Sequence, residues 1–149
     1  MNRQPHRAIQ SGSEEDTVRA GRDFAADIGA GDVVLLSGGL GAGKTAFVRG
    51  LVHGLGGDPG QVSSPTFTII QEYEARVRVH HVDLYRLAPV EVDDLGLDEL
   101  MSGAVVAIEW PERWTDPPAG AIQVSIVQGR ADERTITITR TPAPENLRT

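Results

Sequence analysis

The chain has 149 residues, 40% hydrophobic and 23% charged, which is typical of a single globular domain with its own core. Lys and Arg total 14 against 21 Asp and Glu, and the formal net charge of −7 argues against direct binding of nucleic acid phosphates. There is no cysteine, so disulfides and thiolate metal sites are excluded. No apolar run could span a bilayer or serve as a secretory signal, and we therefore expect a cytoplasmic protein without membrane contact.

The first half of the chain shows alternating helix and strand signals. Ser13 followed by Asp16 is a capping-box pattern, which predicts a helix that ends near Ala30. The continuous apolar run 33–36 is typical of a buried parallel strand. Apolar residues then recur at helical spacing over 47–55, which predicts a second helix.

The middle of the chain predicts a hairpin and a further helix. Residues 67–73 and 76–83 are rich in residues that favour strands, and a tight turn separates them. Polar and apolar residues alternate in the second strand, which suggests that one of its faces is exposed to solvent. Of the adjacent His80 and His81, we therefore expect one to be packed and the other solvated. Residues 91–101 suggest an acidic helix.

Residues 104–108 predict a second buried strand, and alternating residues over 122–126 and 136–138 predict a second hairpin. Together with the glycine-rich stretch 38–45, which lies between the run 33–36 and the helix 47–55, these elements predict an α/β fold of the P-loop NTPase type. We expect a mainly parallel central sheet, added antiparallel hairpin strands and helices on both faces. We also expect one domain over residues 13–140, between a flexible N-terminal tail (1–12) and a flexible C-terminal tail (141–149).

Residues 38–45, Gly-Gly-Leu-Gly-Ala-Gly-Lys-Thr, fit the P-loop pattern G-x-x-x-x-G-K-[ST]. They stand between a predicted strand and a predicted helix, as a P-loop requires. Backbone N–H groups of such a loop surround phosphate oxygens, and glycines let the backbone approach closely. Lys44 is the only lysine, and we expect it to neutralise the β- and γ-phosphates of ATP. The Thr45 hydroxyl is expected to bind Mg²⁺.

Carboxylates at the ends of apolar strands are candidates for the acidic partner of Mg²⁺. Glu109 follows the strand 104–108, and we favour it for metal or catalytic water. Asp83 follows the other candidate strand and could sense the γ-phosphate. Ser64 and Thr66 lie where P-loop proteins place a switch segment, although local sequence alone favours a plain turn.

Four motifs occur in order: the P-loop, Ser-Pro-Thr-Phe (64–67), His-Val-Asp-Leu-Tyr-Arg (81–86) and Glu-Trp (109–110). Over about residues 13–140 this series resembles the bacterial TsaE family, the small ATPase of tRNA threonylcarbamoyladenosine biosynthesis. The resemblance implies ATP and Mg²⁺ as cofactors and slow hydrolysis by the isolated chain. It implies a TsaD-type transferase and a TsaB-type subunit as partners. The modified nucleotide would be the adenosine next to the anticodon of ANN-decoding tRNAs, with tRNA contacted only indirectly.

The resemblance also implies site residues. Lys44, Asp83 and Glu109 would be catalytic, and Thr45 and Glu109 would hold the metal. The implied nucleotide-binding residues are Glu15, Thr17, Gly39, Leu40, Gly41, Ala42, Gly43, Lys44, Thr45, Ala46, Ser64, Thr66, Asp83 and Arg130.

Some of these assignments rest on the resemblance alone. Arg130 looks like the family's nucleotide contact in the last hairpin, and Glu15 and Thr17 resemble the segment near the adenine. The family often has Asp where this chain has Gly39 and Thr where it has Ala46, and neither departure removes a required charge.

Three alternatives use the same loop. A small-molecule kinase would need a lid, for which only the loop 111–120 and the hairpin tip 130–134 are available. A GTP switch usually needs Asn-Lys-x-Asp, and the only lysine already lies in the P-loop. A scaffold that binds ATP without cleaving it has the same sequence features as a slow ATPase.

Overall fold

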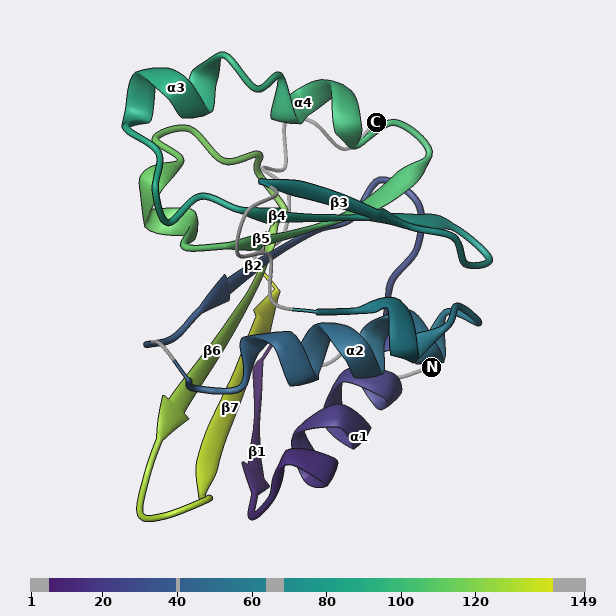
Figure 1. Cartoon of the computed structure of the whole chain (residues 1–149), viewed down its shortest axis with the longest axis vertical. Coiled ribbons are helices and arrows are strands. Elements are labelled where there is room, and N and C mark those ends of the chain that lie inside the picture. The colour runs from purple at the N-terminus through teal and green to yellow at the C-terminus, as the bar shows by residue number, and fades with distance from the viewer. Residues whose placement is uncertain (1–5, 40, 64–68, 141–149) are drawn as a thin grey trace.

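A mixed seven-stranded sheet forms the centre of the protein (Figure 1). The computed structural model describes residues 6–39, 41–63 and 69–140. Over these residues the strand order is β1-β7-β6-β2-β5-β4-β3. The strands are β1 (His6–Ser11), β2 (Val33–Ser37), β3 (Ile70–Tyr73), β4 (Arg78–Asp83), β5 (Ala104–Glu109), β6 (Ile122–Gln128) and β7 (Arg134–Arg140).

The pairing confirms the predicted sheet. The central strands β6, β2, β5 and β4 are parallel to one another, whereas β3, β7 and β1 add at the edges by antiparallel pairing. Both predicted hairpins, β3–β4 and β6–β7, are present. The parallel centre explains why β2 and β5 are continuous apolar runs, since both of their faces are covered.

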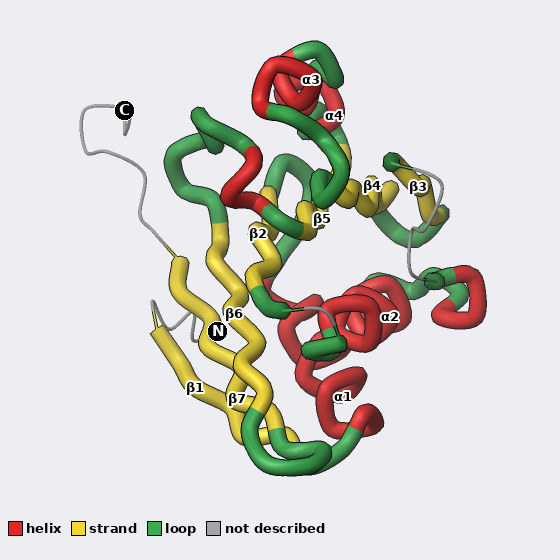
Figure 2. The backbone as a smooth tube through the Cα atoms, turned by 60° about the vertical axis from the view of Figure 1, so that its left-hand side comes forward, coloured by secondary structure: helices red, strands yellow, loops and turns green. Residues whose placement is uncertain are grey.

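Helices cover both faces of the sheet, as predicted (Figure 2). One face carries the longer pair, and the other carries two short helices. The helices are α1 (Glu14–Phe24), α2 (Lys44–Gly54), α3 (Pro89–Asp93) and α4 (Leu97–Leu100), with single 3₁₀ turns η1 (Ala25–Asp27), η2 (Pro59–Gln61) and η3 (Pro111–Arg113). None of the described helices is long and apolar enough to cross a bilayer.

Alternate residues of the central strands divide the core into two clusters. Val34 and Leu36 of β2 pack in the cluster that includes α1 and α2. Val33 and Leu35 pack in the other cluster, with residues of α3 and α4. Each such side chain contributes about 1.5–3 kcal/mol on full burial, so β2 is fixed from both sides.

Two glycines let α1 and α2 approach until their backbones touch. A Cβ atom at Gly50 would lie 1.8 Å from the carbonyl oxygen of Val18, and one at Gly21 would lie 2.1 Å from that of Phe47. The rings of Phe24 and Phe47 pack beside this crossing, with centroids 5.6 Å apart. The crossing therefore fixes α2, and with it the P-loop at the start of α2.

The expectation of a flexible tail over residues 1–12 is wrong for residues 6–11. These residues form β1, which pairs with β7 and places Ile9 opposite Ile136. Ile9 packs against the core cluster of α1 and α2. Local sequence gave no sign of this strand because β7, its pairing partner, lies more than 120 residues away. The predicted C-terminal tail, 141–149, lies outside the described residues.

Two local expectations also differ from the structure. The helix expected over 91–101 is interrupted, because Gly96 adopts φ 67° and separates α3 from α4. His80 and His81 are both buried, at 9% and 0% exposure, where one was expected in solvent. The reason is that β4 is an interior strand between β5 and β3.

Candidate nucleotide site

The P-loop connects the end of β2 to the start of α2. Gly43 precedes the first helical residue, Lys44, and adopts φ 109°, a conformation that favours glycine. A Cβ at Gly38 would lie 2.8 Å from the carbonyl oxygen of Ile126, so the loop also passes close to β6. The first turn of α2 is thereby directed at a cavity of about 460 Å³.

Most of the predicted site residues line this one cavity. They come from α1, the P-loop, α2 and the carboxyl ends of β4 and β5. These two strands are neighbours in the sheet. The predicted residues that line it are Thr17, Gly41, Ala42, Gly43, Lys44, Thr45, Ala46, Asp83 and Glu109.

Other predicted residues are not among those that line the cavity. Glu15 is exposed and lines a separate hollow beside α1. Gly39 and Arg130 are exposed and do not line the cavity. Three further predicted residues lie outside the described part of the chain: Leu40, Ser64 and Thr66.

Lys44 is buried in the wall of the cavity, with 5% exposure. Its Nζ donates to the carbonyl oxygen of Gly38 at 2.8 Å and lies 3.9 Å from Oε1 of Glu109. The same atom lies 4.0 Å from the centre of a Trp110 ring. Burial lowers the pKa of Lys44 below its ordinary 10.5, and the carboxylates of Glu109, Asp83 and Glu112 oppose that shift.

Asp83 and Glu109 lie opposite each other in the β4–β5 register. Oδ1 of Asp83 accepts a hydrogen bond from the backbone N–H of Tyr85 at 2.9 Å. Burial raises the pKa of Asp83 above its ordinary 3.8. The hydrogen bond from the Tyr85 N–H opposes this increase in the pKa, and the nearby charge of Glu109 adds to the increase. Glu109 is 5% exposed, and its Oε2 lies 2.6 Å from Nε2 of His81.

Arg134, at the start of β7, contacts the P-loop, a role that the sequence analysis did not assign, and the expected nucleotide contact of Arg130 stays a prediction. The Arg134 guanidinium donates to the carbonyl oxygens of Ala42 at 3.0 Å and Gly41 at 3.4 Å. Sequence reasoning missed this because both arginines flank one turn, and only the β6–β7 register decides which side chain faces the loop.

Tyr85, Trp110 and Arg49 are among the further residues that line the cavity. Tyr85 and Trp110 pack against each other, with ring centroids 4.8 Å apart, and the sequence gave them no definite role. Trp110 has φ 62°, an uncommon conformation for a residue other than glycine. Arg49 lies one helical turn after Thr45, and its guanidinium donates to the carboxylate of Glu14 at 3.2 Å. Helical spacing from Thr45 could have indicated that Arg49 lines the cavity.

The donors at this cavity suit a hard cation. Thr45, Asp83 and Glu109 offer hydroxyl and carboxylate oxygens, the ligand atoms that Mg²⁺ prefers. Within the described residues, no group of three or more His, Cys, Asp or Glu could hold a metal ion by itself. Mg²⁺ commonly keeps waters and shares phosphate oxygens with a nucleotide, so the donor set fits Mg²⁺ that arrives with a nucleotide.

The fold and the cavity define a P-loop nucleotide-binding α/β protein. A model of the family described as "Threonylcarbamoyl adenosine biosynthesis protein TsaE" matches residues 11–136. The chain belongs to the TsaE family.

Relatives agree with this assignment. The chain is 43% identical over 133 residues to a Nostoc protein named tRNA threonylcarbamoyladenosine biosynthesis protein TsaE, covering 85% of this chain and 81% of that protein. It is 43% identical over 128 residues to the protein of that name from Bacillus subtilis, covering 84% and 80%. The crystal structure of YdiB from B. subtilis is similar, with a TM-score of 0.73, 33% identity and coverage of 92% of this chain and 86% of that chain.

Proposed function

We propose that this protein binds ATP with Mg²⁺ and hydrolyses it in tRNA threonylcarbamoyladenosine biosynthesis. The observation that carries this proposal is the buried Lys44 at the start of α2. Its ammonium group lies beside the carboxylate of Glu109 in the wall of one cavity. An ammonium group there can neutralise phosphate oxygens that the N-terminus of α2 and the loop N–H groups bind. Family membership supplies the pathway.

Lys44 is the main phosphate-binding side chain in this proposal. Its Nζ now donates to Gly38 O, and a triphosphate would offer stronger, charged acceptors. Burial lowers the pKa of Lys44, and the nearby carboxylates of Glu109 and Asp83 oppose that shift. The ammonium group can then stabilise negative charge that develops on the β- and γ-phosphate oxygens when the bond between them breaks.

The two carboxylates take different roles. Thr45 and Glu109 would hold Mg²⁺, which neutralises phosphate charge when it is bound. Asp83 faces the same cavity, and its raised pKa makes it a better proton acceptor for a water molecule that attacks the γ-phosphorus. The Tyr85 N–H holds this carboxylate in place.

The partners in this proposal are a TsaD-type transferase and a TsaB-type subunit. A net charge of −7 favours contact with tRNA through these partners over direct contact. Hydrolysis by the isolated chain is then expected to be slow, with partners completing the site.

The test measures ATP, ADP and GTP binding by calorimetry, and phosphate release with and without TsaB and TsaD. We expect ATP to bind in preference to GTP, Lys44→Ala to weaken binding at least about 10-fold, and Arg76→Ala to bind as the parent chain does. We expect the partners to accelerate multiple-turnover phosphate release. Equal binding by Lys44→Ala contradicts the proposed site. Transfer of phosphate to a metabolite in preference to water favours a kinase.

A further inference from the structure

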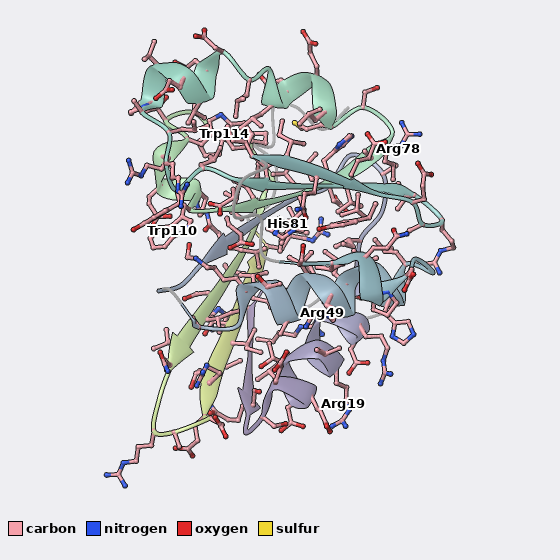
Figure 3. The ribbon with its side chains drawn as sticks, viewed as in Figure 1. Arg19, Arg49, Arg78, His81, Trp110 and Trp114 are labelled. Carbon is pink, nitrogen blue, oxygen red and sulfur yellow. The ribbon has the colours of Figure 1, made fainter. Side chains whose placement is uncertain are left out.

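A row of polar side chains extends from Glu109, in which His81 and Tyr73 are buried and Gln71 is half-buried. His81 lies on β4, while Tyr73 and Gln71 lie on β3 next to it. None of these three side chains is among those that line the cavity. Figure 3 labels His81, which lies on the α2 side of the sheet and is fully buried.

His81 contacts Glu109 directly. Its Nε2 lies 2.6 Å from Oε2 of Glu109, and both side chains are almost completely buried. An ionised carboxylate can only accept, so Nε2 carries the proton and donates. A short, charge-assisted hydrogen bond in a buried setting fixes the rotation of the carboxylate more firmly than an exposed contact would.

Tyr73 supports the opposite side of the imidazole ring. The Tyr73 hydroxyl lies 3.4 Å from Nδ1 of His81, and it also bonds the side-chain oxygen of Gln71. Gln71 is paired with His81 in the β3–β4 register. Tyr73 has a single hydroxyl proton, so the Gln71 oxygen and an unprotonated Nδ1 of His81 are alternative acceptors for it.

The two oxygens of Glu109 therefore have different surroundings. Oε2 is held by His81, whereas Oε1 faces Lys44 at 3.9 Å. We propose that His81, supported by Tyr73, is a positioning residue that turns Oε1 of Glu109 toward the P-loop cavity. This inference rests on the proposed function, because it assigns the held carboxylate to the Mg²⁺–ATP site.

An apolar residue would serve better if position 81 only filled the core. On this face of β4 and β5, the neighbours of His81 other than Asp83 and Glu109 are apolar, namely Val79, Val105 and Ala107. A buried imidazole requires partners for its nitrogen atoms, and it finds them in Glu109 and Tyr73. The contact with Glu109 therefore explains why a polar residue occupies this position, which packing alone does not explain.

The first experiment compares His81→Leu, which removes the donor, with His81→Gln, which keeps an N–H donor. His80→Leu is the matched control, because it removes the adjacent buried histidine from the opposite face. We expect His81→Leu to weaken ATP binding in Mg²⁺ by about 10- to 100-fold, with binding in EDTA unchanged. His81→Gln should recover most of the loss, and His80→Leu should bind as the parent chain does. Equal losses with and without Mg²⁺, or no rescue by His81→Gln, overturn the proposal.

A double-mutant cycle separates positioning from general destabilisation. In a Glu109→Gln background, His81→Leu should change Mg²⁺-dependent ATP affinity by less than about 2-fold, because His81 acts through Glu109. A loss as large as that in the parent chain overturns the proposal. If His81→Leu does not fold, Tyr73→Phe takes its place, since it removes only the supporting hydroxyl.

A measurement on the free protein distinguishes failure of the positioning role of His81 from failure of the proposed ATPase function. The NMR spectrum of the free protein should show a slowly exchanging Nε2 proton of His81, and Glu109→Gln should shift its resonance. The absence of that resonance, or no shift, overturns the positioning role even if ATP binds normally. Suppose that the Nε2 resonance is present and shifts in Glu109→Gln, but that neither the parent chain nor Lys44→Ala binds ATP. The proposed function then fails, and the role of His81 in the Mg²⁺–ATP site fails with it.

Discussion

The side chain of Arg134 bonds the P-loop from the far end of the chain, with its Nε 3.0 Å from the carbonyl oxygen of Ala42. The same guanidinium donates to the carbonyl oxygens of Ala131 and Glu133 in its own turn, at 3.0 and 2.9 Å. One planar group with five N–H donors thus connects the β6–β7 hairpin to the phosphate-binding loop. The shape of the loop depends on this hairpin as well as on its own glycines.

Replacing Arg134 should loosen the P-loop. We expect Arg134→Gln to lower the free energy of unfolding by about 1–2 kcal/mol, since several hydrogen bonds to backbone carbonyls are lost. ATP affinity should fall with it, as measured by calorimetry. Arg130→Gln is the control, because Arg130 is exposed and does not line the cavity. A larger loss of stability at Arg130 than at Arg134 would contradict the role of Arg134 in holding the loop.

The crossing of α1 and α2 should not tolerate a methyl group at Gly50. Alanine normally stabilises a helix interior relative to glycine by about 0.5–1 kcal/mol. Here the added Cβ would lie 1.8 Å from the carbonyl oxygen of Val18. We therefore expect Gly50→Ala to lose at least about 1–3 kcal/mol in urea unfolding. Gly29→Ala, where a Cβ meets nothing within 4 Å, should be neutral or stabilising. Equal stability of the two variants contradicts the close crossing.

Asp83 should reduce the stability of the free protein at neutral pH. Burial raises the pKa of Asp83 above its ordinary 3.8, so the folded state binds this proton more tightly than the unfolded chain does. The contribution of Asp83 to the free energy of unfolding therefore falls as pH rises from 3.8 through the raised value.

Asp83→Asn removes this effect and keeps an oxygen that can accept from the Tyr85 N–H. We expect the variant to be more stable than the parent chain at neutral pH, with a difference that shrinks as the pH approaches 3.8. It should bind ATP but hydrolyse it more slowly, because the proton acceptor is lost. Urea unfolding across this pH range measures the first expectation, and a difference that is independent of pH would disprove it.

Trp110 should report nucleotide binding by fluorescence. Its ring lies 4.0 Å from Nζ of Lys44, and ATP should draw that ammonium group toward phosphate. The chain has two tryptophans, and Trp114 is buried in the core cluster of α3 and α4. We expect Trp114→Phe to keep an emission change on ATP binding, while Trp110→Phe loses it. An unchanged spectrum in Trp114→Phe, under conditions where calorimetry shows binding, would contradict the movement of Lys44.

The site was predictable from sequence where its residues are neighbours in the chain. Lys44 and Thr45 follow from the P-loop pattern, because the loop and the helix N-terminus that form it are one continuous segment. Asp83 and Glu109 were identified as strand ends, because parallel neighbouring strands end at the same edge of a sheet. Strand order supplied only the confirmation that β4 and β5 are neighbours.

Contacts between distant segments were not predictable in the same way. The strand at His6–Ser11 depends on β7, and the choice of Arg134 over Arg130 depends on hairpin register. The burial of both histidines depends on β4 lying inside the sheet. Each of these follows from which segments pair and in which register. A local sequence pattern does not identify the pairing partner, which for β1 lies more than 120 residues away.

The sequence by itself determined the phosphate-binding loop, the strand–loop–helix unit that carries it and the family to which the chain belongs. Local backbone requirements and hydrophobic periodicity act over a few residues, so they can be read directly from the chain. Only the tertiary structure decided that His81 holds Glu109 and that Arg134 holds the loop. The physical reason is that side chains separated by 28 and 92 residues meet only when the sheet order and register are fixed.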